Sequence, residues 1–191
     1  DLTGTDIYRP ETGQFVFQQG PLFHNLVLAD EINRAPAKVQ SALLEAMAEH
    51  QITVGNKTYA LPELFLVMAT QNPLEQEGTY PLPEAQLDRF LMHLEIDYPD
   101  ADTELQILQL TRNEELSKPS ALPPTLSQQD IFAARKDALA LHMAPALETY
   151  LVQLIMATRR PENFSPELAQ WIEFGASPRA TISLDRCARA H

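Results

Sequence analysis

Glycine and lysine are scarce in this sequence of 191 residues, which contains six glycines and four lysines. No glycine is followed by a lysine, so the sequence lacks the G-x-x-x-x-G-K-[ST] loop that cradles nucleotide phosphates. The G-x-G-x-x-G pattern of dinucleotide-binding folds is missing as well. By itself, the sequence is therefore neither a complete phosphate-loop hydrolase nor the opening of a dinucleotide-binding domain.

Cysteine, long apolar runs and positive charge are also in short supply. The single cysteine, Cys187, cannot form an internal disulfide, which is typical of a reducing compartment, so we expect a cytoplasmic protein. The longest purely apolar run, 64–69, is too short to span a membrane. Lys and Arg number 14 against 26 Asp and Glu, and a net charge of -12 disfavours nucleic acid as a partner. Because the sequence starts at Asp1 rather than Met, we expect it to be a segment of something longer.

Two short apolar runs each end in polar residues suited to phosphate chemistry. Residues 26–29 are followed by Asp30 and Glu31, and residues 64–69 lead to Asn72. Such runs are typical of buried parallel strands, whose carboxyl ends form the ligand-binding edge of an open α/β sheet. The pattern predicts an α/β fold with these two strands at its centre.

Other segments predict a third strand, a hairpin and several helices. The third strand is expected at 91–96, and Gly55-Asn56 joins two extended runs into a β-hairpin near 51–61. Residues 1–22 are expected to be irregular apart from a strand-like stretch at 14–18. Pro36 suits the first turn of a helix. Further helices are expected at 84–90, 101–117, 128–142, 145–160, 166–174 and from 178 onward.

These elements divide the chain into three parts. Residues 1–98 form the α/β part, and 99–125 hold a helix and a proline-rich connector. Residues 126–191 contain no convincing strand and are expected to be all helical.

The adjacent acids Asp30 and Glu31 admit two interpretations of equal weight. Neighbouring carboxylates at the end of a strand face in different directions, so one can hold a hydrated Mg²⁺ and the other can orient a water. Alternatively, Asp30 caps the helix that begins near Pro36, and Glu31 is solvated. For Asn72 taken alone, the pattern favours a common Asn-Pro turn, although an amide at a strand end can also contact a terminal phosphate.

Two arginines are candidates for phosphate contacts. Arg89, near the end of a short predicted helix, offers a rigid fork for phosphate oxygens, although the position taken in isolation favours a surface salt bridge with a nearby acid. Ser177 is the expected N-cap of another predicted helix, Pro178 takes its first position, and Arg179 follows in the first turn. A cation there opposes the helix dipole, which indicates an anionic partner, although surface arginines often tolerate this position.

Taken together, these segments resemble the MoxR family of AAA+ ATPases. The resemblance covers nearly the whole chain and rests on dense matches. They are DLTGT at the start, LVLADEINRA at 26–35, QSALLEAM at 40–47, ATQNP at 69–73, EQEGTYPLPEAQLDRFL at 75–91 and GASPRA at 175–180.

The resemblance implies a role for each candidate residue. Asp30 looks like the Walker B aspartate that holds Mg²⁺ through water, and Glu31 like the glutamate that activates the attacking water. Asn72 looks like sensor 1. Arg89 looks like the arginine finger, which acts on the nucleotide of a neighbouring subunit, and Arg179 like sensor 2 of a helical lid.

Family resemblance also implies ATP and Mg²⁺ as cofactors, a hexameric ring and chaperone-like remodelling or maturation of protein complexes. A von Willebrand A-domain protein is the expected partner. A non-hydrolysing AAA+-like scaffold is the alternative function, and a nucleic-acid motor is disfavoured by the acidic balance. The sequence does not identify the client complex.

The sequence departs from the family because it lacks the Walker A loop and the core strand that precedes it. In AAA+ domains that strand lies between those corresponding here to 64–69 and 91–96. The resemblance therefore implies an incomplete αβα core followed by a truncated all-α lid. Without its neighbour, strand 91–96 would leave backbone groups unsatisfied, so we expect it to repack, to pair with another molecule or to lack order.

The missing loop leads to a direct prediction for residues 1–191 expressed alone. We expect no measurable ATPase activity and weak or absent nucleotide binding, because the amides and lysine that grip the β- and γ-phosphates are not present. Titration calorimetry with ATP and Mg²⁺ checks this, and a micromolar affinity would contradict it.

Overall fold

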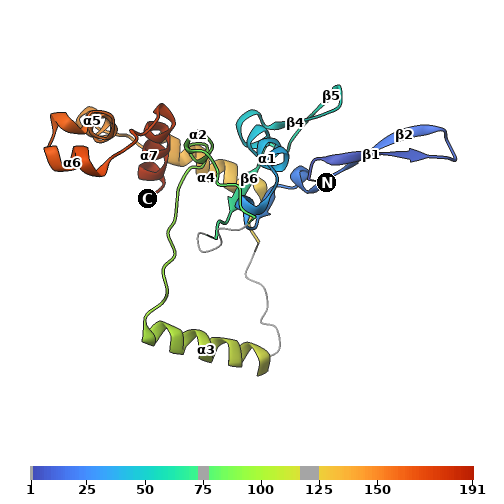
Figure 1. Cartoon of the computed structure of the whole chain (residues 1–191), viewed down its shortest axis with the longest axis horizontal. Helices are drawn as coiled ribbons and strands as arrows, with labels where there is room; N and C mark the ends of the chain where they lie inside the picture. Colours follow the sequence, from blue (N-terminus) through green and yellow to red (C-terminus); the bar gives the residue numbers. More distant parts are fainter. Residues whose placement is uncertain (1, 73–77, 117–124) are drawn as a thin grey trace. The chain divides into compact units, whose positions relative to one another are not determined.

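The computed structural model describes residues 2–72, 78–116 and 125–191 (Figure 1). The chain divides into two compact units, Asp1–Leu91 with Leu154–Thr181, and Met92–Gln153 with Ile182–His191. The strands and all the candidate site residues belong to the first unit. A parallel strand pair followed by a helical C-terminal part confirms the predicted α/β class.

The parallel pair joins β3 (Leu26–Ala29) to β6 (Leu66–Ala69). Leu26 lies opposite Leu66, and Ala29 lies opposite Ala69. Parallel strands that are paired in register end together, so the residues after Ala29 and Ala69 meet at one edge of the sheet.

Only one face of this pair is buried. Val27 is 8% exposed, whereas Leu26 and Leu28 on either side of it are 68% and 66% exposed. Leu66 and Met68 of β6 are exposed in the same alternation. The strands expected to be buried are thus buried on one face, because successive side chains of a strand point to opposite sides.

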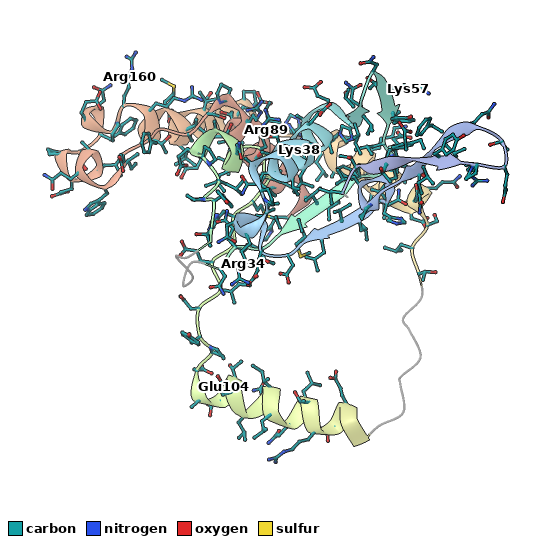
Figure 2. The ribbon with its side chains drawn as sticks, turned by 45° about the vertical axis from the view of Figure 1, so that its right-hand side comes forward. Arg34, Lys38, Lys57, Arg89, Glu104 and Arg160 are labelled. Carbon is teal, nitrogen blue, oxygen red and sulfur yellow. The ribbon has the colours of Figure 1, made fainter. Side chains whose placement is uncertain are left out.

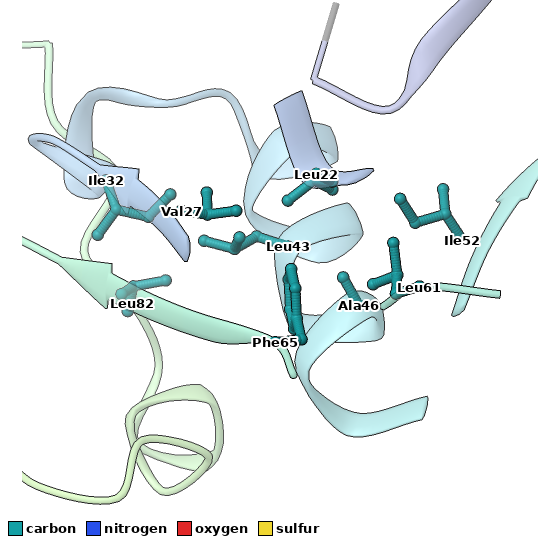
Figure 3. Packing of buried hydrophobic residues seen from close by; sticks show 9 residues of the cluster. All are labelled: Leu22, Val27, Ile32, Leu43, Ala46, Ile52, Leu61, Phe65 and Leu82. Atoms are coloured by element: carbon teal, nitrogen blue, oxygen red, sulfur yellow. The ribbon is translucent and has the colours of Figure 1, made fainter. Parts of the chain in front are cut away.

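Helix α1 (Ala37–Glu49) supplies much of the core next to the strands. It begins after Pro36, as predicted, and ends at His50, whose backbone is left-handed. Leu43 is 1% exposed and Ala46 is fully buried. Both pack with Val27 in one hydrophobic cluster, shown in Figure 3. The cluster consists of Leu22, Val27, Ile32, Leu43, Ala46, Ile52, Leu61, Phe65 and Leu82.

Two β-hairpins extend from the first unit (Figure 1). The predicted one is confirmed, with β4 (Gln51–Val54) paired to β5 (Lys57–Ala60) around Gly55 at φ +60°. The expectation of irregular structure over 1–22 is wrong, because β1 (Gly4–Arg9) pairs with β2 (Gln14–Gln19). The polar sequence of β1 hides this strand, whose pairing is instead specified by the turn at Gly13 (φ +66°).

An aromatic cluster joins the two hairpins. The rings of Phe17 in β2 and Tyr59 in β5 stack with centroids 4.2 Å apart. Phe23, in the short 3-10 helix η1 (Pro21–Phe23) before β3, packs edge-on against both rings. Offset and edge-to-face aromatic pairs are favourable beyond their burial, so this cluster ties both hairpins to the start of β3.

The predicted third strand does not form. Residues 91–96 are all described and have no strand structure, and Leu94 and Ile96 are 75% and 93% exposed. Repacking, one of the three expected outcomes, is therefore excluded. A strand needs a neighbour to pair its N–H and C=O groups, and the strand expected beside 91–96 is not among the residues of the chain.

The predicted helices are confirmed with small differences at their ends. Ser127 caps α4 in a capping box with Asp130. The Ser127 hydroxyl and, to a smaller extent, its backbone N–H donate hydrogen bonds to the Asp130 carboxylate, and these bonds lower the pKa of Asp130. The first unit contains α2 (Glu84–Leu87), shorter than predicted, and α6 (Pro166–Trp171). The second unit contains α3 (Ala101–Leu116) and α4 (Gln128–Ala140). The residues of α5 (Pro145–Arg159) and of α7 (Pro178–Ala190) are divided between the two units.

Leu43 tests the core directly. Replacing Leu43 with Ala should lower the free energy of unfolding by about 2–5 kcal/mol, because the side chain is buried and truncation leaves a cavity. Urea denaturation followed by circular dichroism measures the change. Leu28→Ala is the matched control, since that leucine is 66% exposed, and it should cost less than about 1 kcal/mol. Equal losses in the two variants would contradict this description of the core.

Candidate functional site

The carboxyl ends of β3 and β6 bring Asp30 and Glu31 against Thr70. The Thr70 hydroxyl donates a hydrogen bond to Asp30 Oδ1 at 2.5 Å. The Thr70 hydroxyl oxygen also accepts a hydrogen bond from the Glu31 backbone N–H at 2.8 Å. One hydroxyl therefore contacts both members of the predicted acidic pair.

Glu31 has an unusual backbone conformation. Its φ and ψ of 47° and 52° lie in the left-handed region, which costs a residue with a Cβ about 1–2 kcal/mol. Hydrogen bonds from the Glu31 and Ile32 backbone N–H groups to Thr70, the latter to its carbonyl at 2.9 Å, hold this turn. The 3-10 helix η2 (Ile32–Arg34) follows directly. Backbone strain of this kind clusters at functional sites.

The structure excludes one of the two interpretations of the acidic pair, in which Asp30 caps the helix near Pro36. Pro36 is the N-cap of α1, and no side chain caps that helix, so the interpretation of Asp30 as its cap is wrong. Glu31 is not merely solvated either, because Glu31 Oε2 lies 3.0 Å from Arg34 Nη1. Both side chains of this ion pair are partly exposed, so the pair adds little stability. Figure 2 labels Arg34.

Asn33 connects this edge to Asn72. The Asn33 side chain is 7% exposed, and its Nδ2 donates to the backbone carbonyl of Asn72 at 3.2 Å. Among the described residues, Asn33 Oδ1 has no hydrogen-bond partner, which is costly for a buried acceptor. The structure therefore places the backbone of Asn72 beside η2, next to the acidic pair.

Gln40 holds the segment around Tyr80 against the same turn. This side chain of α1 is 4% exposed, and its Nε2 donates to the carbonyls of Ile32 at 3.1 Å and Tyr80 at 2.9 Å. The Tyr80 N–H donates in turn to the Asn33 carbonyl at 2.5 Å. Buried polar groups of this kind are stable only when they are satisfied, so they fix the turn that carries Asn33.

The two candidate arginines belong to a second group of contacts. Arg89, labelled in Figure 2, donates from Nη1 to the Leu44 carbonyl of α1 at 3.0 Å, and no acid among the described residues forms an ion pair with it. Arg179 Nη1 lies 3.2 Å from Asp88 Oδ2. In the structure Arg179 therefore pairs with Asp88, the residue before Arg89.

Ser177 strengthens the second group. The Ser177 hydroxyl donates a hydrogen bond to Asp88 Oδ1 at 2.5 Å. The Ser177 hydroxyl oxygen also accepts a hydrogen bond from the Arg179 backbone N–H at 3.0 Å. The predicted N-cap at Ser177 is therefore confirmed. Asp88 accepts hydrogen bonds from both Ser177 and Arg179, which places Arg179 close to the turn after α2 in which Arg89 lies.

Sequence reasoning missed Thr70, Asn33 and Asp88. All three stand next to predicted residues, in Thr70-Gln71-Asn72, Asp30-Glu31-Ile32-Asn33 and Asp88-Arg89. Their polarity beside a strand end or a short helix is the only sequence signal. Their partners depend on pairings across 39 to 91 residues that no local pattern specifies.

In the part of the chain that the structure describes, no group of three or more His, Cys, Asp or Glu side chains is arranged to hold a metal ion. No single described helix is long and apolar enough to cross a membrane, and only α4 with α5, bent by 98°, meets the criteria of length and composition as a pair.

A parallel strand pair with acids at one strand end and an Asn beyond the other, followed by a helical part, is the arrangement that the resemblance to AAA+ ATPases implies. A family model described as "ATPase family associated with various cellular activities (AAA)" matches residues 1–92. The crystal structure of a candidate ATPase from Cytophaga hutchinsonii superposes with a TM-score of 0.86 at 46% identity. The match covers 100% of this chain and 57% of that one.

Curated relatives narrow the class. The chain is 44% identical to Chaperone MoxR1 of Mycobacterium tuberculosis and 42% identical to YeaC of Bacillus subtilis, each over 100% of its length. It is 31% identical to Protein MoxR of Paracoccus denitrificans. The chain belongs to the MoxR family of AAA+ ATPases. It spans 50%, 57% and 61% of the lengths of these three relatives.

The contact between Asp88 and Ser177 is open to a stability test. We expect Ser177→Ala and Asp88→Asn each to destabilise the chain, and a double-mutant cycle to give a coupling energy of about 0.5–1.5 kcal/mol, because the hydroxyl donates to a carboxylate at 2.5 Å. Urea denaturation of the four proteins supplies the values. Ser165→Ala is the matched control, since Ser165 caps α6 without contacting Asp88. It should show no coupling with Asp88→Asn, and additivity of Ser177 with Asp88 would argue against the contact.

Proposed function

We propose that the protein containing this chain hydrolyses ATP with Mg²⁺ and uses the energy for chaperone-like remodelling or maturation of protein complexes. Membership of the AAA+ ATPase class supports nucleotide hydrolysis, and the relative named Chaperone MoxR1 supports a chaperone role. The observation that carries the proposal is the joining of Asp30 and Glu31 to Thr70 at the carboxyl ends of a parallel strand pair. Ligands of open α/β sheets bind at this edge.

The residues at this edge fit a hydrated Mg²⁺ and an attacking water. Carboxylate oxygens are the ligands that Mg²⁺ prefers, usually with several waters retained, so Asp30 is the proposed partner of the ion. When bound, Mg²⁺ would neutralise charge on the phosphate chain. Glu31, held in a fixed turn, is proposed to orient the attacking water, and Asn72 to contact that water or the γ-phosphate.

The arginines are proposed to act at the same reaction from other positions. Arg89 is proposed to stabilise transition-state charge on the nucleotide of a neighbouring subunit, which requires a ring, and a hexamer is the arrangement we infer. Arg179 is proposed to contact nucleotide. In the present structure its guanidinium pairs with Asp88, so nucleotide contact requires this ion pair to open or to be shared.

The resemblance to the family is also the basis of the proposed partner and location. We infer a von Willebrand A-domain protein as the partner and the cytoplasm as the site of action.

Glu31 provides the decisive test of hydrolysis. In the full-length protein that contains this chain, Glu31→Gln should reduce ATP turnover at least about 100-fold, because the amide cannot accept the proton of the attacking water. Phosphate release measures turnover, and a fluorescent ATP analogue shows whether nucleotide binding is retained. Glu49→Gln, the same change at an exposed residue at the end of α1, should keep full activity. Unimpaired hydrolysis in Glu31→Gln would refute the assignment, and an inactive parent protein that still binds ATP would favour a scaffold.

A further inference from the structure

Thr70 has two roles in the structure, and they use different atoms. Its backbone belongs to the sheet edge, since Thr70 N–H donates to the Ala29 carbonyl at 3.1 Å and its carbonyl accepts the Ile32 N–H at 2.9 Å. Its side-chain hydroxyl makes the bonds to Asp30 Oδ1 and the Glu31 N–H. Removing the hydroxyl alone therefore leaves the backbone connections of β3 and β6 in place.

The hydroxyl bonds act on the two properties that an acidic pair needs for phosphate chemistry. A hydrogen bond to Asp30 Oδ1 fixes the rotation of that carboxylate, and so decides where Oδ2 lies. A hydrogen bond from the Glu31 N–H to the same hydroxyl supports the left-handed backbone of Glu31, from which its side chain projects. A hydroxyl can donate one bond and accept another at once, which neither an aliphatic nor a carbonyl group can do.

We propose that Thr70 is a positioning residue that sets the orientation of Asp30 and Glu31 for hydrolysis. The proposal rests on the function proposed above, since it takes those two carboxylates as the metal-holding and water-orienting groups. Thr70 touches neither ion nor water in this account. It acts through its hydroxyl, which donates a hydrogen bond to the Asp30 carboxylate and accepts one from the strained backbone of Glu31.

Amide hydrogen exchange in the full-length protein tests the bridge without any activity measurement. In Thr70→Val, which keeps the shape but removes the hydroxyl, the Glu31 amide should exchange about tenfold faster because it loses its acceptor. The Ile32 amide should keep its protection, because its acceptor is the backbone carbonyl of residue 70. Thr70→Ser retains the hydroxyl and should leave both amides as they are in the unaltered protein. An unchanged Glu31 amide in Thr70→Val would overturn the bridge.

Steady-state kinetics of the same proteins test the positioning. Thr70→Val should lower kcat by about 10- to 100-fold and raise the Mg²⁺ concentration for half-maximal activity, with KM for ATP changed less than about threefold. Thr70→Ser should recover activity to within about threefold of the unaltered protein. A purely structural loss would lower the amount of folded protein without moving the Mg²⁺ requirement.

Thr53→Val is the matched control. Thr53 in β4 also donates its hydroxyl to a carboxylate, Glu45 Oε1 at 2.9 Å, but on α1 rather than at the strand ends. This variant should keep kcat and the Mg²⁺ dependence. An active parent whose Thr70→Val variant has normal kcat and Mg²⁺ dependence would overturn the proposal and leave the proposed function standing. A parent that releases no phosphate would overturn the proposed function itself and, with it, the catalytic part of this inference, while the exchange rates would still decide the bridge.

Discussion

The parallel pairing of β3 with β6 is the constraint on which the rest of the structure depends. These strands are separated by α1 and the β4–β5 hairpin in the sequence, yet their in-register pairing makes them end together. Only then can Thr70 reach Asp30 and the Glu31 backbone across 39 and 40 residues of sequence. A shift of one residue in this register would turn Thr70 to the opposite face of the sheet and break both contacts.

The apolar core explains why that register is kept. Val27 faces the cluster built around Leu43 and Ala46, while its neighbours in β3 face outward. A shift of β3 by one residue would place a leucine where Val27 is now buried. It would also disturb a cluster that includes Ile32, before α1, and Leu61, after the β4–β5 hairpin. Hydrophobic packing therefore selects the register, and the register places the polar site. Gln40, in α1 itself, then joins η2 to the segment of Tyr80 with bonds that the core shields from water.

Much of this arrangement is predictable from local pattern. The apolar runs before Asp30 and near Asn72, the Gly55 turn and the helix caps at Ser127 and Ser177 depend on neighbours a few residues away, and the structure has all of them. The strand at 91–96 fails for the opposite reason, because a strand exists only where another strand pairs with it. Thr70 and Asp88 could not be singled out, since their partners become neighbours only after long-range pairing.

The Asp30–Glu31 turn and the side chain of Arg179 differ in how firmly the structure holds them. The backbone of Asp30 and Glu31 is held by strand pairing, by the Thr70 hydroxyl and by a turn packed on buried Asn33 and Gln40, so the path of this turn is set before any ligand arrives. Arg179, by contrast, is held by an ion pair in which its own side chain is 57% exposed. Exposed ion pairs contribute little and exchange partners readily, so a phosphate can compete with Asp88 for this guanidinium at small cost. The acidic half of the site is thus preorganised, and the cationic half is the part that a nucleotide can rearrange.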